Sequence, residues 1–219
     1  MRIARRGKAL YLCSRNMQIL KDDTRRRILT QSRKLFLEKG FRDTTTRDIA
    51  SASGVVLSSL YRYFSSKDDL FLYIVKPAMS ALEDMLERHH NPGRNDIAAI
   101  RSDRFVEDSL QEYLTIIERH RETLKILLLR ADGSTLENYK EYYVNKSTGM
   151  VMEWFSAMKA RYPGMNTQVS EFFIHLNNVW MFTLLEEILM HDLPEDETRS
   201  VLSDYIQFEF TGWMKMMKV

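Results

Sequence analysis

The side chains best suited to bind a ligand or nucleic acid lie between Thr44 and Lys67, around a single glycine. This stretch carries hydroxyls, tyrosines and an arginine, which bond to phosphate oxygens and reach the edges of DNA bases. The composition therefore indicates a surface that contacts DNA. The residues expected on that surface are Val56, Leu57, Ser58, Ser59, Tyr61, Arg62 and Tyr63.

Two short helices joined by a glycine turn must position these side chains. Ile49 and Ala50 give the first helix its apolar side, and any threonine of residues 44–46 can cap its free N–H groups. Gly54 stands where a left-handed cap is expected, because glycine has no Cβ to clash there. This order predicts a helix-turn-helix. The apolar residues expected to point into a small core are Val55, Leu60 and Phe64.

Neighbouring helices should hold this unit in place. The spacing of apolar residues predicts a first helix from Asp22 or Asp23 to about Lys39, ended by Gly40. Ser66 should cap a longer helix that reaches His89 or His90, with Asp69 at the capping-box position. Pro77 should bend or interrupt that helix, and we expect it to act as a hinge.

The overall composition favours an all-α protein. The chain has 219 residues with only 4 prolines and 8 glycines, and it lacks clear alternating β-branched runs. We expect a flexible basic arm over residues 1–20, which could also touch DNA phosphates or a minor groove. A DNA-binding domain over residues 21–67 and a larger helical domain over residues 68–219 should follow.

The charge is divided unevenly along the chain. Residues 1–66 carry 15 Lys and Arg against 5 Asp and Glu, whereas residues 67–219 carry 17 against 25. Such segregation points to an anionic partner for the first part only. An anionic membrane surface is the rival partner for this basic face, but the tyrosines and Lys67 beside a glycine turn favour DNA.

Other functional classes have little support. Cys13 is the single cysteine, so no intramolecular disulfide can form, and no apolar run is long enough to span a bilayer. We therefore expect a cytoplasmic protein without a membrane partner. Glu187 and His191 are four residues apart, but an exposed ion pair is the better interpretation than a metal site. No catalytic or phosphate-loop motif is present, so we expect no enzyme, cofactor or metal.

Helical patterns continue through the second part of the chain. They predict helices at about 97–119, 121–131, 135–161, 167–190 and 195–216. The last two are apolar over wide faces, which is more than one packed face needs. Either both are central, or together they form the interface of a homodimer, which we favour. The residues proposed for that interface are Phe172, Val179, Trp180, Tyr205 and Phe208.

A ligand pocket is expected between the middle helices. Pockets combine apolar walls with a few polar groups, and the aromatic and histidine side chains of this region supply both. For any single one of them, a core role is the better interpretation. The candidates for ligand binding are Tyr113, His120, Tyr143, Trp154, Phe173 and His175, with Tyr139, Met158 and Asn178 as further members. The many aromatic residues of this acidic part favour a hydrophobic or cationic ligand.

The segment from Thr24 to Phe71 resembles the DNA-binding half of the TetR family of bacterial transcriptional repressors. A basic first helix ends in Phe-x-Glu-Lys-Gly-Phe, and Thr-Thr-x-Asp-Ile-Ala, Gly-Val, Leu-Tyr-x-Tyr-Phe and Lys-x-x-Leu follow in register. The resemblance covers about 50 residues. Val56 and Leu57 depart from it, because polar residues are common at both positions; Leu57 could contact thymine methyl groups.

The resemblance implies an all-helical homodimer that binds a near-palindromic operator and is released by a small-molecule effector. Thr45 and Thr46 would contact phosphate, and Arg47 a base or a phosphate. Leu57, Ser58 and Ser59 would face the groove. Tyr61 and Tyr63 would contact the DNA backbone or bases, and Lys67 would bind a further phosphate. Two alternatives remain: the larger domain binds a protein instead of a small molecule, or the protein activates transcription.

Overall fold

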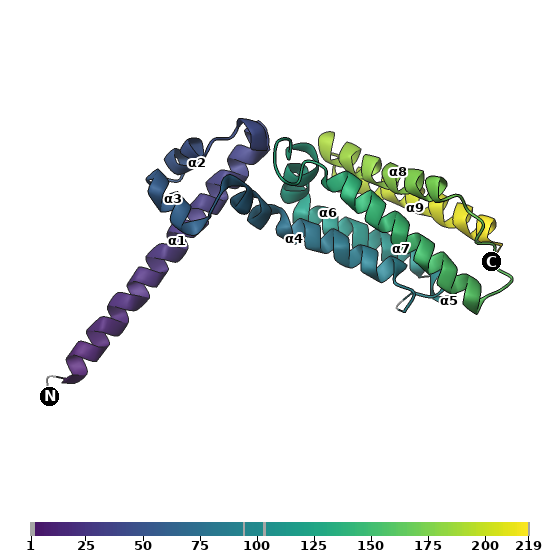
Figure 1. Ribbon diagram of the computed structural model, residues 1–219, viewed down its shortest axis with the longest axis horizontal. Coiled ribbons are helices and arrows are strands. Elements are labelled where there is room, and N and C mark those ends of the chain that lie inside the picture. The colour runs from purple at the N-terminus through teal and green to yellow at the C-terminus, as the bar shows by residue number, and fades with distance from the viewer. Residues whose placement is uncertain (1–2, 94, 103, 219) are drawn as a thin grey trace.

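The computed structural model describes residues 3–93, 95–102 and 104–218, with side chains from Leu20 onward. All regular structure in these residues is helical, which confirms the all-α prediction. A small head and a larger helical body lie at the two ends of an elongated molecule (Figure 1). None of the described helices combines the length and apolar character needed to cross a bilayer.

The head is formed by α1 (Ile3–Asp43), α2 (Thr46–Ala52) and α3 (Leu57–Tyr63), closed by the start of α4 (Lys67–His90). Three phenylalanine rings hold it together: Phe71 of α4 meets Phe36 and Phe41 edge-on, with ring centroids 5.2 and 5.0 Å apart. The core of the head therefore includes the first turns of α4, just beyond the boundary expected at residues 67–68.

The body is a bundle in which α4 packs on α6 (Phe105–Leu129), α6 on α9 (Glu195–Met217), and α7 (Tyr139–Arg161) on α8 (Glu171–Met190). The short α5 (Ile97–Ile100) lies at the end of α7 that is remote from the head (Figure 1). Its Asp96 cap accepts a hydrogen bond from the N–H of Ala98. The start predicted for the last helix at residue 195 is confirmed.

Several predicted helix boundaries are wrong. The first helix begins at Ile3 instead of near Asp22, so the backbone of the expected arm is helical from that residue. A break expected at residue 120 is absent, because α6 is continuous there; the real interruption lies after Ile100. The helices expected to begin at residues 135 and 167 begin at Tyr139 and Glu171.

The structural reason for the later starts is local hydrogen bonding. Before α7, the hydroxyl of Ser134 accepts a bond from the N–H of Leu136, which holds a turn there. Before α8, the side chain of Asn166 accepts a bond from the N–H of Gln168. Such side chains compete with helical bonds and delay the helix.

Helix α4 is not interrupted at Pro77, contrary to one expectation. The ring removes only one N–H from the helical ladder, and the buried Ile74, Val75 and Ala78 on either side keep the helix packed. The predicted cap is confirmed, since the Ser66 hydroxyl accepts a bond of 3.0 Å from the N–H of Asp69. The Asp69 carboxylate bonds back to the N–H of Ser65 instead of Ser66, so the predicted box is shifted by one residue.

Candidate nucleic-acid interface and ligand pocket

The start of α2 is fixed by a reciprocal pair of hydrogen bonds. The Thr45 hydroxyl accepts a bond of 3.1 Å from the N–H of Asp48, and the Asp48 carboxylate accepts one of 3.0 Å from the N–H of Thr45. These bonds to Thr45, from its N–H first and its hydroxyl next, lower the pKa of Asp48. Thr45 is thus the cap among the three candidate threonines, whereas Thr44 is buried and bonds to the Gly40 carbonyl at 2.7 Å.

The turn between α2 and α3 depends on Gly54, which has a φ of +63°. A side chain would be strained at this angle, which explains why glycine occupies the predicted left-handed position. Beyond the turn, Leu60 and Phe64 are buried as expected, while Val55 is only partly covered. The two buried side chains orient the opposite face of α3 outward.

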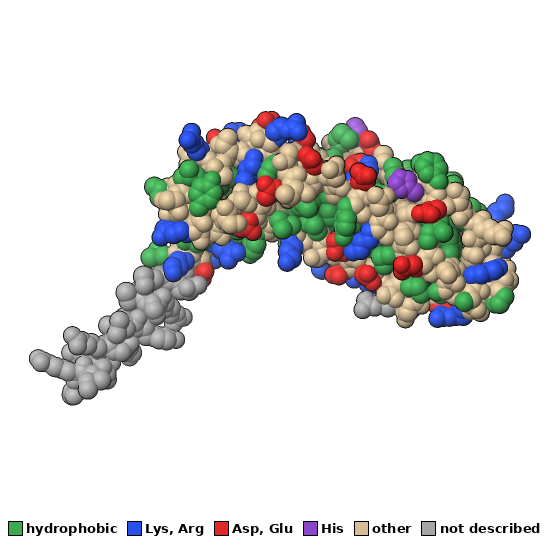
Figure 2. Space-filling view, viewed as in Figure 1, with side chains coloured by type: hydrophobic (Ala, Val, Ile, Leu, Met, Phe, Trp, Pro, Cys, Tyr) green, Lys and Arg blue, Asp and Glu red, His purple; other side chains and the backbone are tan. Residues whose placement is uncertain are grey.

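The outward face of α3 carries Ser58, Tyr61 and Arg62. The Arg62 guanidinium donates a bond of 2.9 Å to the Ser59 hydroxyl, and the Tyr61 phenol lies 3.5 Å from the Thr46 hydroxyl. Arg47 of α2 is also exposed, and Lys and Arg side chains stand out over the head in Figure 2. The remaining predicted groove residues, Leu57, Ser59 and Tyr63, are partly buried.

Lys67 has structural bonds that the sequence did not predict. Its ammonium donates to the carbonyls of Phe41 and Thr44, at 2.7 and 2.9 Å, and lies 3.9 Å from the centroid of the Phe41 ring. Burial is the main cause that lowers its pKa. An ammonium has three donors, so one is left for the predicted phosphate contact.

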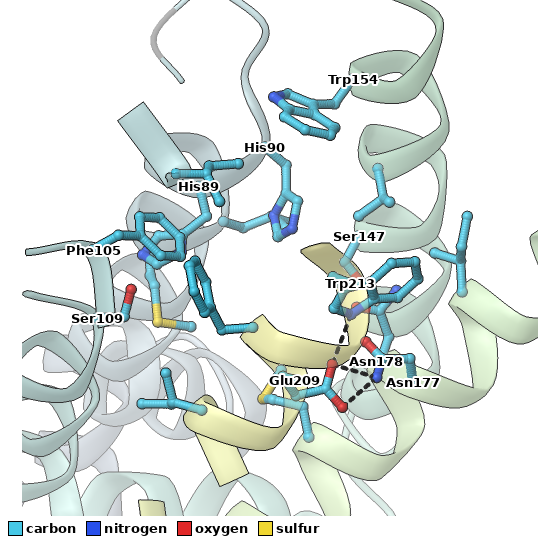
Figure 3. Close-up of a pocket in the computed structure, with 18 of the residues that line it drawn as sticks. His89, His90, Phe105, Ser109, Ser147, Trp154, Asn177, Asn178, Glu209 and Trp213 are labelled. Atoms are coloured by element: carbon cyan, nitrogen blue, oxygen red, sulfur yellow. Dashed lines mark hydrogen bonds between the residues drawn. The ribbon is translucent and has the colours of Figure 1, made fainter. Parts of the chain in front are cut away.

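A pocket of about 210 Å³ opens in the body between α4, α6, α7, α8 and α9. Apolar and aromatic side chains dominate its wall, including Phe105, Trp154 and Trp213 (Figure 3). Of the predicted ligand-binding residues, Tyr113, Tyr143 and Trp154 line it, as does Asn178. The apolar wall with a few polar groups is typical of a small-molecule site, although the volume is below the roughly 300–1,000 Å³ common for such sites, which favours a small ligand.

The other predicted pocket residues lie outside this lining. His120 is on α6, where its carbonyl accepts a bond from the Thr123 hydroxyl, and partial burial lowers its pKa. The His175 ring stacks on Phe172, with centroids 6.1 Å apart. Phe173 meets the pocket residue Trp213 edge-on, and Tyr139 and Met158 are buried in the core.

Several polar residues of the lining were missed in the sequence, among them His89, His90 and Glu209. His89 bonds at 2.6 Å to Glu112, which also accepts from Arg88, and the pKa of Glu112 is lowered despite its burial, because these two partners bond to the carboxylate. The Nδ1 atom of His90 is buried, without a hydrogen-bond partner in the described part of the chain. Burial first, and the neighbouring His89 next, lower the pKa of His90 to about 4.

Glu209 could have been found from its spacing. It stands four residues after Tyr205 and four before Trp213, so all three share one face of α9. Both of these aromatic residues line the pocket. A carboxylate within a stripe of aromatic residues was therefore the sequence signal for this pocket residue.

The outer faces of α8 and α9 expose large apolar side chains. Phe172 and Phe208 are 67% and 65% exposed, and Trp180 is 45% exposed. The Trp180 ring meets Tyr205 and Phe208 edge-on, at 5.2 and 5.5 Å, so these rings form one cluster. Val179 is partly buried beside it, and hydrophobic side chains interrupt the polar surface over these helices in Figure 2.

The described residues contain no group of three or more His, Cys, Asp and Glu side chains placed to share a metal ion. Glu187 and His191 lie 3.1 Å apart as an exposed pair, as the sequence predicted.

Comparison with known proteins identifies the head. Residues 28–74 match the family model described as bacterial regulatory proteins, tetR family. The transcriptional repressor KstR2 of Rhodococcus jostii is 44% identical over 50 residues, which are 23% of this chain and 24% of that protein. The transcriptional regulator HbdR of Aromatoleum is 32% identical over 69 residues, or 32% of this chain and 30% of that protein. The matches thus span less than a third of these relatives.

Solved structures extend the likeness to the whole fold. NalD of Pseudomonas aeruginosa, described as the secondary repressor of a multidrug efflux pump, has a TM-score of 0.56 at 20% identity, covering 88% of this chain and 96% of NalD. A regulator from Streptomyces coelicolor has a TM-score of 0.58 at 17% identity, covering 84% of this chain and 90% of that one. The head thus matches the DNA-binding segment of the tetR family over residues 28–74, and the whole chain shares the fold of these solved regulators.

Proposed function

We propose that the chain is a transcriptional repressor that binds a near-palindromic operator as a homodimer and leaves it when a small molecule occupies the body. The face of α3 that exposes Ser58, Tyr61 and Arg62 carries this proposal. KstR2 and NalD are both described as repressors, which favours repression over activation. The residues proposed to contact DNA are Thr45, Thr46, Arg47, Leu57, Ser58, Ser59, Tyr61, Arg62, Tyr63 and Lys67.

Release by a ligand is supported by the bonds between pocket and head. Helix α6 lines the pocket with Phe105, Ser109 and Tyr113. At its other end the Arg130 carbonyl accepts a bond of 2.9 Å from the N–H of Phe41. A ligand that shifts α6 can therefore bias the position of the head, provided that it binds the DNA-free state better.

Two further bonds join the loop between α6 and α7, residues 130–138, to the head. Arg42 lies 2.6 Å from the Asp132 carboxylate, and the N–H of Thr135 donates a bond of 2.8 Å to Asp68. The exposed Arg42 pair contributes little energy by itself. Together with the Phe41 bond, these contacts join α6 to both α1 and α4.

The first experiment measures binding of the purified protein to the DNA upstream of its own gene, by fluorescence anisotropy over a salt series. We expect preference over a scrambled duplex and a steep loss of affinity with salt, because phosphate contacts release counterions. Tyr61→Ala should weaken binding about tenfold or more, as expected when a base or backbone contact is lost.

The control is Tyr142→Ala, which removes an exposed tyrosine of α7, far along the chain from the head. It should bind like the unmodified protein. Equal, weak binding of both duplexes would contradict operator recognition, and binding to anionic vesicles would then identify the head as a general anion surface.

A further inference from the structure

The pocket has an unusual distribution of charge. Among the described residues that line it, Glu209 is the one acidic side chain, and neither lysine nor arginine joins it. The other polar groups on the wall are hydroxyls, amides and the rings of His89 and His90. The charge of Glu209 therefore dominates the electrostatic field in the pocket.

The neighbours of Glu209 solvate its charge but do not neutralise it. The Asn177 amide donates to both carboxylate oxygens at 2.7 Å, and the Trp213 indole donates at 2.8 Å (Figure 3). Both donors are neutral groups. They hold the carboxylate in a fixed position on the wall, as a preorganised anion.

His90 does not supply a compensating positive charge at neutral pH. Burial lowers the pKa of His90 to about 4, so its ring is neutral at pH 7. His89 is bonded to Glu112, which also pairs with Arg88. The Glu112 carboxylate beside His89 is therefore already paired.

The surrounding wall is rich in aromatic rings. Phe105, Phe155, Trp154, Trp213 and Phe210 line the pocket, and Tyr113 and Tyr205 add phenols whose pKa values are raised, mainly by burial and further by Glu209 or Glu112. The faces of such rings attract cations. The anionic side chain of Glu209 and the ring faces thus both favour a positively charged ligand.

We propose that this pocket selects an apolar organic cation, such as a quaternary or protonated amine, whose charged group is placed against Glu209 and whose apolar part contacts the aromatic wall. The inference rests on the proposed ligand-binding role of the body. An anionic ligand would meet repulsion from Glu209, and a neutral one would gain only from apolar contacts.

The test compares three probes that share one chain length and differ in charge: octyltrimethylammonium, n-octanol and octyl sulfate. Each is titrated into the full-length protein by calorimetry, with the fluorescence of Trp154 and Trp213 as a second signal. We expect the cation to bind tightest and the sulfate weakest. A wild-type protein that binds octanol or octyl sulfate as tightly as the cation, or that binds none of the three, would overturn the proposal without any variant.

Glu209→Gln then isolates the charge, because glutamine keeps the size and a carbonyl that accepts from the same two donors. Its affinity for octyltrimethylammonium should fall about tenfold, and its affinity for octanol should stay the same. The matched control is Glu153→Gln, the same exchange at an exposed position of α7. Equal affinity of both variants for the cation would contradict the role of Glu209.

The DNA assay keeps this proposal separate from the repressor proposal. If the cation binds selectively but leaves operator affinity unchanged, the release mechanism is wrong and the ligand class stands. If operator binding responds to octanol or octyl sulfate and not to the cation, the release mechanism stands and the ligand class is wrong.

Discussion

Single residues in the head combine structural and proposed functional roles. Thr45 caps α2 and is also proposed to contact phosphate, and Lys67 bonds to two backbone carbonyls while the resemblance assigns it a phosphate contact. A cation already held by neutral acceptors keeps its full charge, so it can stabilise the head and attract DNA together. Substitution of Lys67 would therefore change stability and DNA affinity at once, whereas Tyr61 isolates the DNA contact.

His90 should make the protein less stable in mild acid. Its pKa of about 4 in the folded state is below the ordinary value of 6.5, so the unfolded chain takes up a proton first as the pH falls. The stability that neutral His90 permits is present above about pH 6.5 and is lost progressively toward pH 4. From pH 7 to pH 5 we expect the free energy of unfolding to fall by about 2 kcal/mol more in the wild type than in His90→Gln.

Urea unfolding at the two pH values measures this difference. The control is His191→Gln, an exposed histidine on the C-terminal cap of α8, which should keep the pH dependence of the wild type. A His90→Gln protein with the wild-type pH dependence would show that His90 is not held neutral by burial.

At the scale of elements, the sequence predicts best where local chemistry decides. Gly40 and Gly54 were expected at helix ends because only glycine tolerates their backbone angles, and the structure has φ values of +81° and +63° there. The continuity of α6 past His120 and the late starts of α7 and α8 were missed, because apolar spacing does not mark such boundaries. The prediction of pocket residues was half right. Helical spacing shows which residues lie on the inner face of a helix but not which of them border a cavity.

The end of the main helical run of α1 should depend on Gly40. Its φ of +81° and ψ of 172° lie in a region that is almost closed to other residues, so Gly40→Ala should lower the free energy of unfolding by about 1–3 kcal/mol. The added Cβ would lie 3.6 Å from the Arg130 carbonyl, an ordinary contact, so backbone strain is the cause. Thermal or urea unfolding gives the value.

Gly149→Ala is the matched control for that substitution. Gly149 lies within α7 with no atom within 4 Å of an added Cβ, so alanine should stabilise the protein there by about 0.5–1 kcal/mol. Changes of opposite sign in the free energy of unfolding for the two substitutions would confirm that the backbone angle at Gly40 matters. A neutral Gly40→Ala would mean that the chain can relax this turn without cost.

At the scale of the whole molecule, the head, the pocket and the exposed aromatic cluster lie on helices that contact one another. Helix α6 borders the pocket and packs on α1, α4 and α9. Tyr205 of α9 lines the pocket on one side and meets Trp180 of the aromatic cluster. Ligand binding and association of two chains are therefore expected to influence each other.

The aromatic cluster of α8 and α9 should hold two chains together. Trp180→Glu places a charge among apolar rings that a partner would cover, so we expect it to be monomeric in sedimentation experiments at concentrations where we expect the wild type to form a dimer. One head makes few DNA contacts, and linked heads gain affinity from their high effective concentration. The monomer should consequently bind the operator about a hundredfold more weakly, or worse.

Tyr142→Glu, at an exposed position of α7 outside the cluster, should remain dimeric with wild-type affinity. A Trp180→Glu protein that stays dimeric would place the interface on another surface, and one that is monomeric but binds the operator normally would show that a single head suffices.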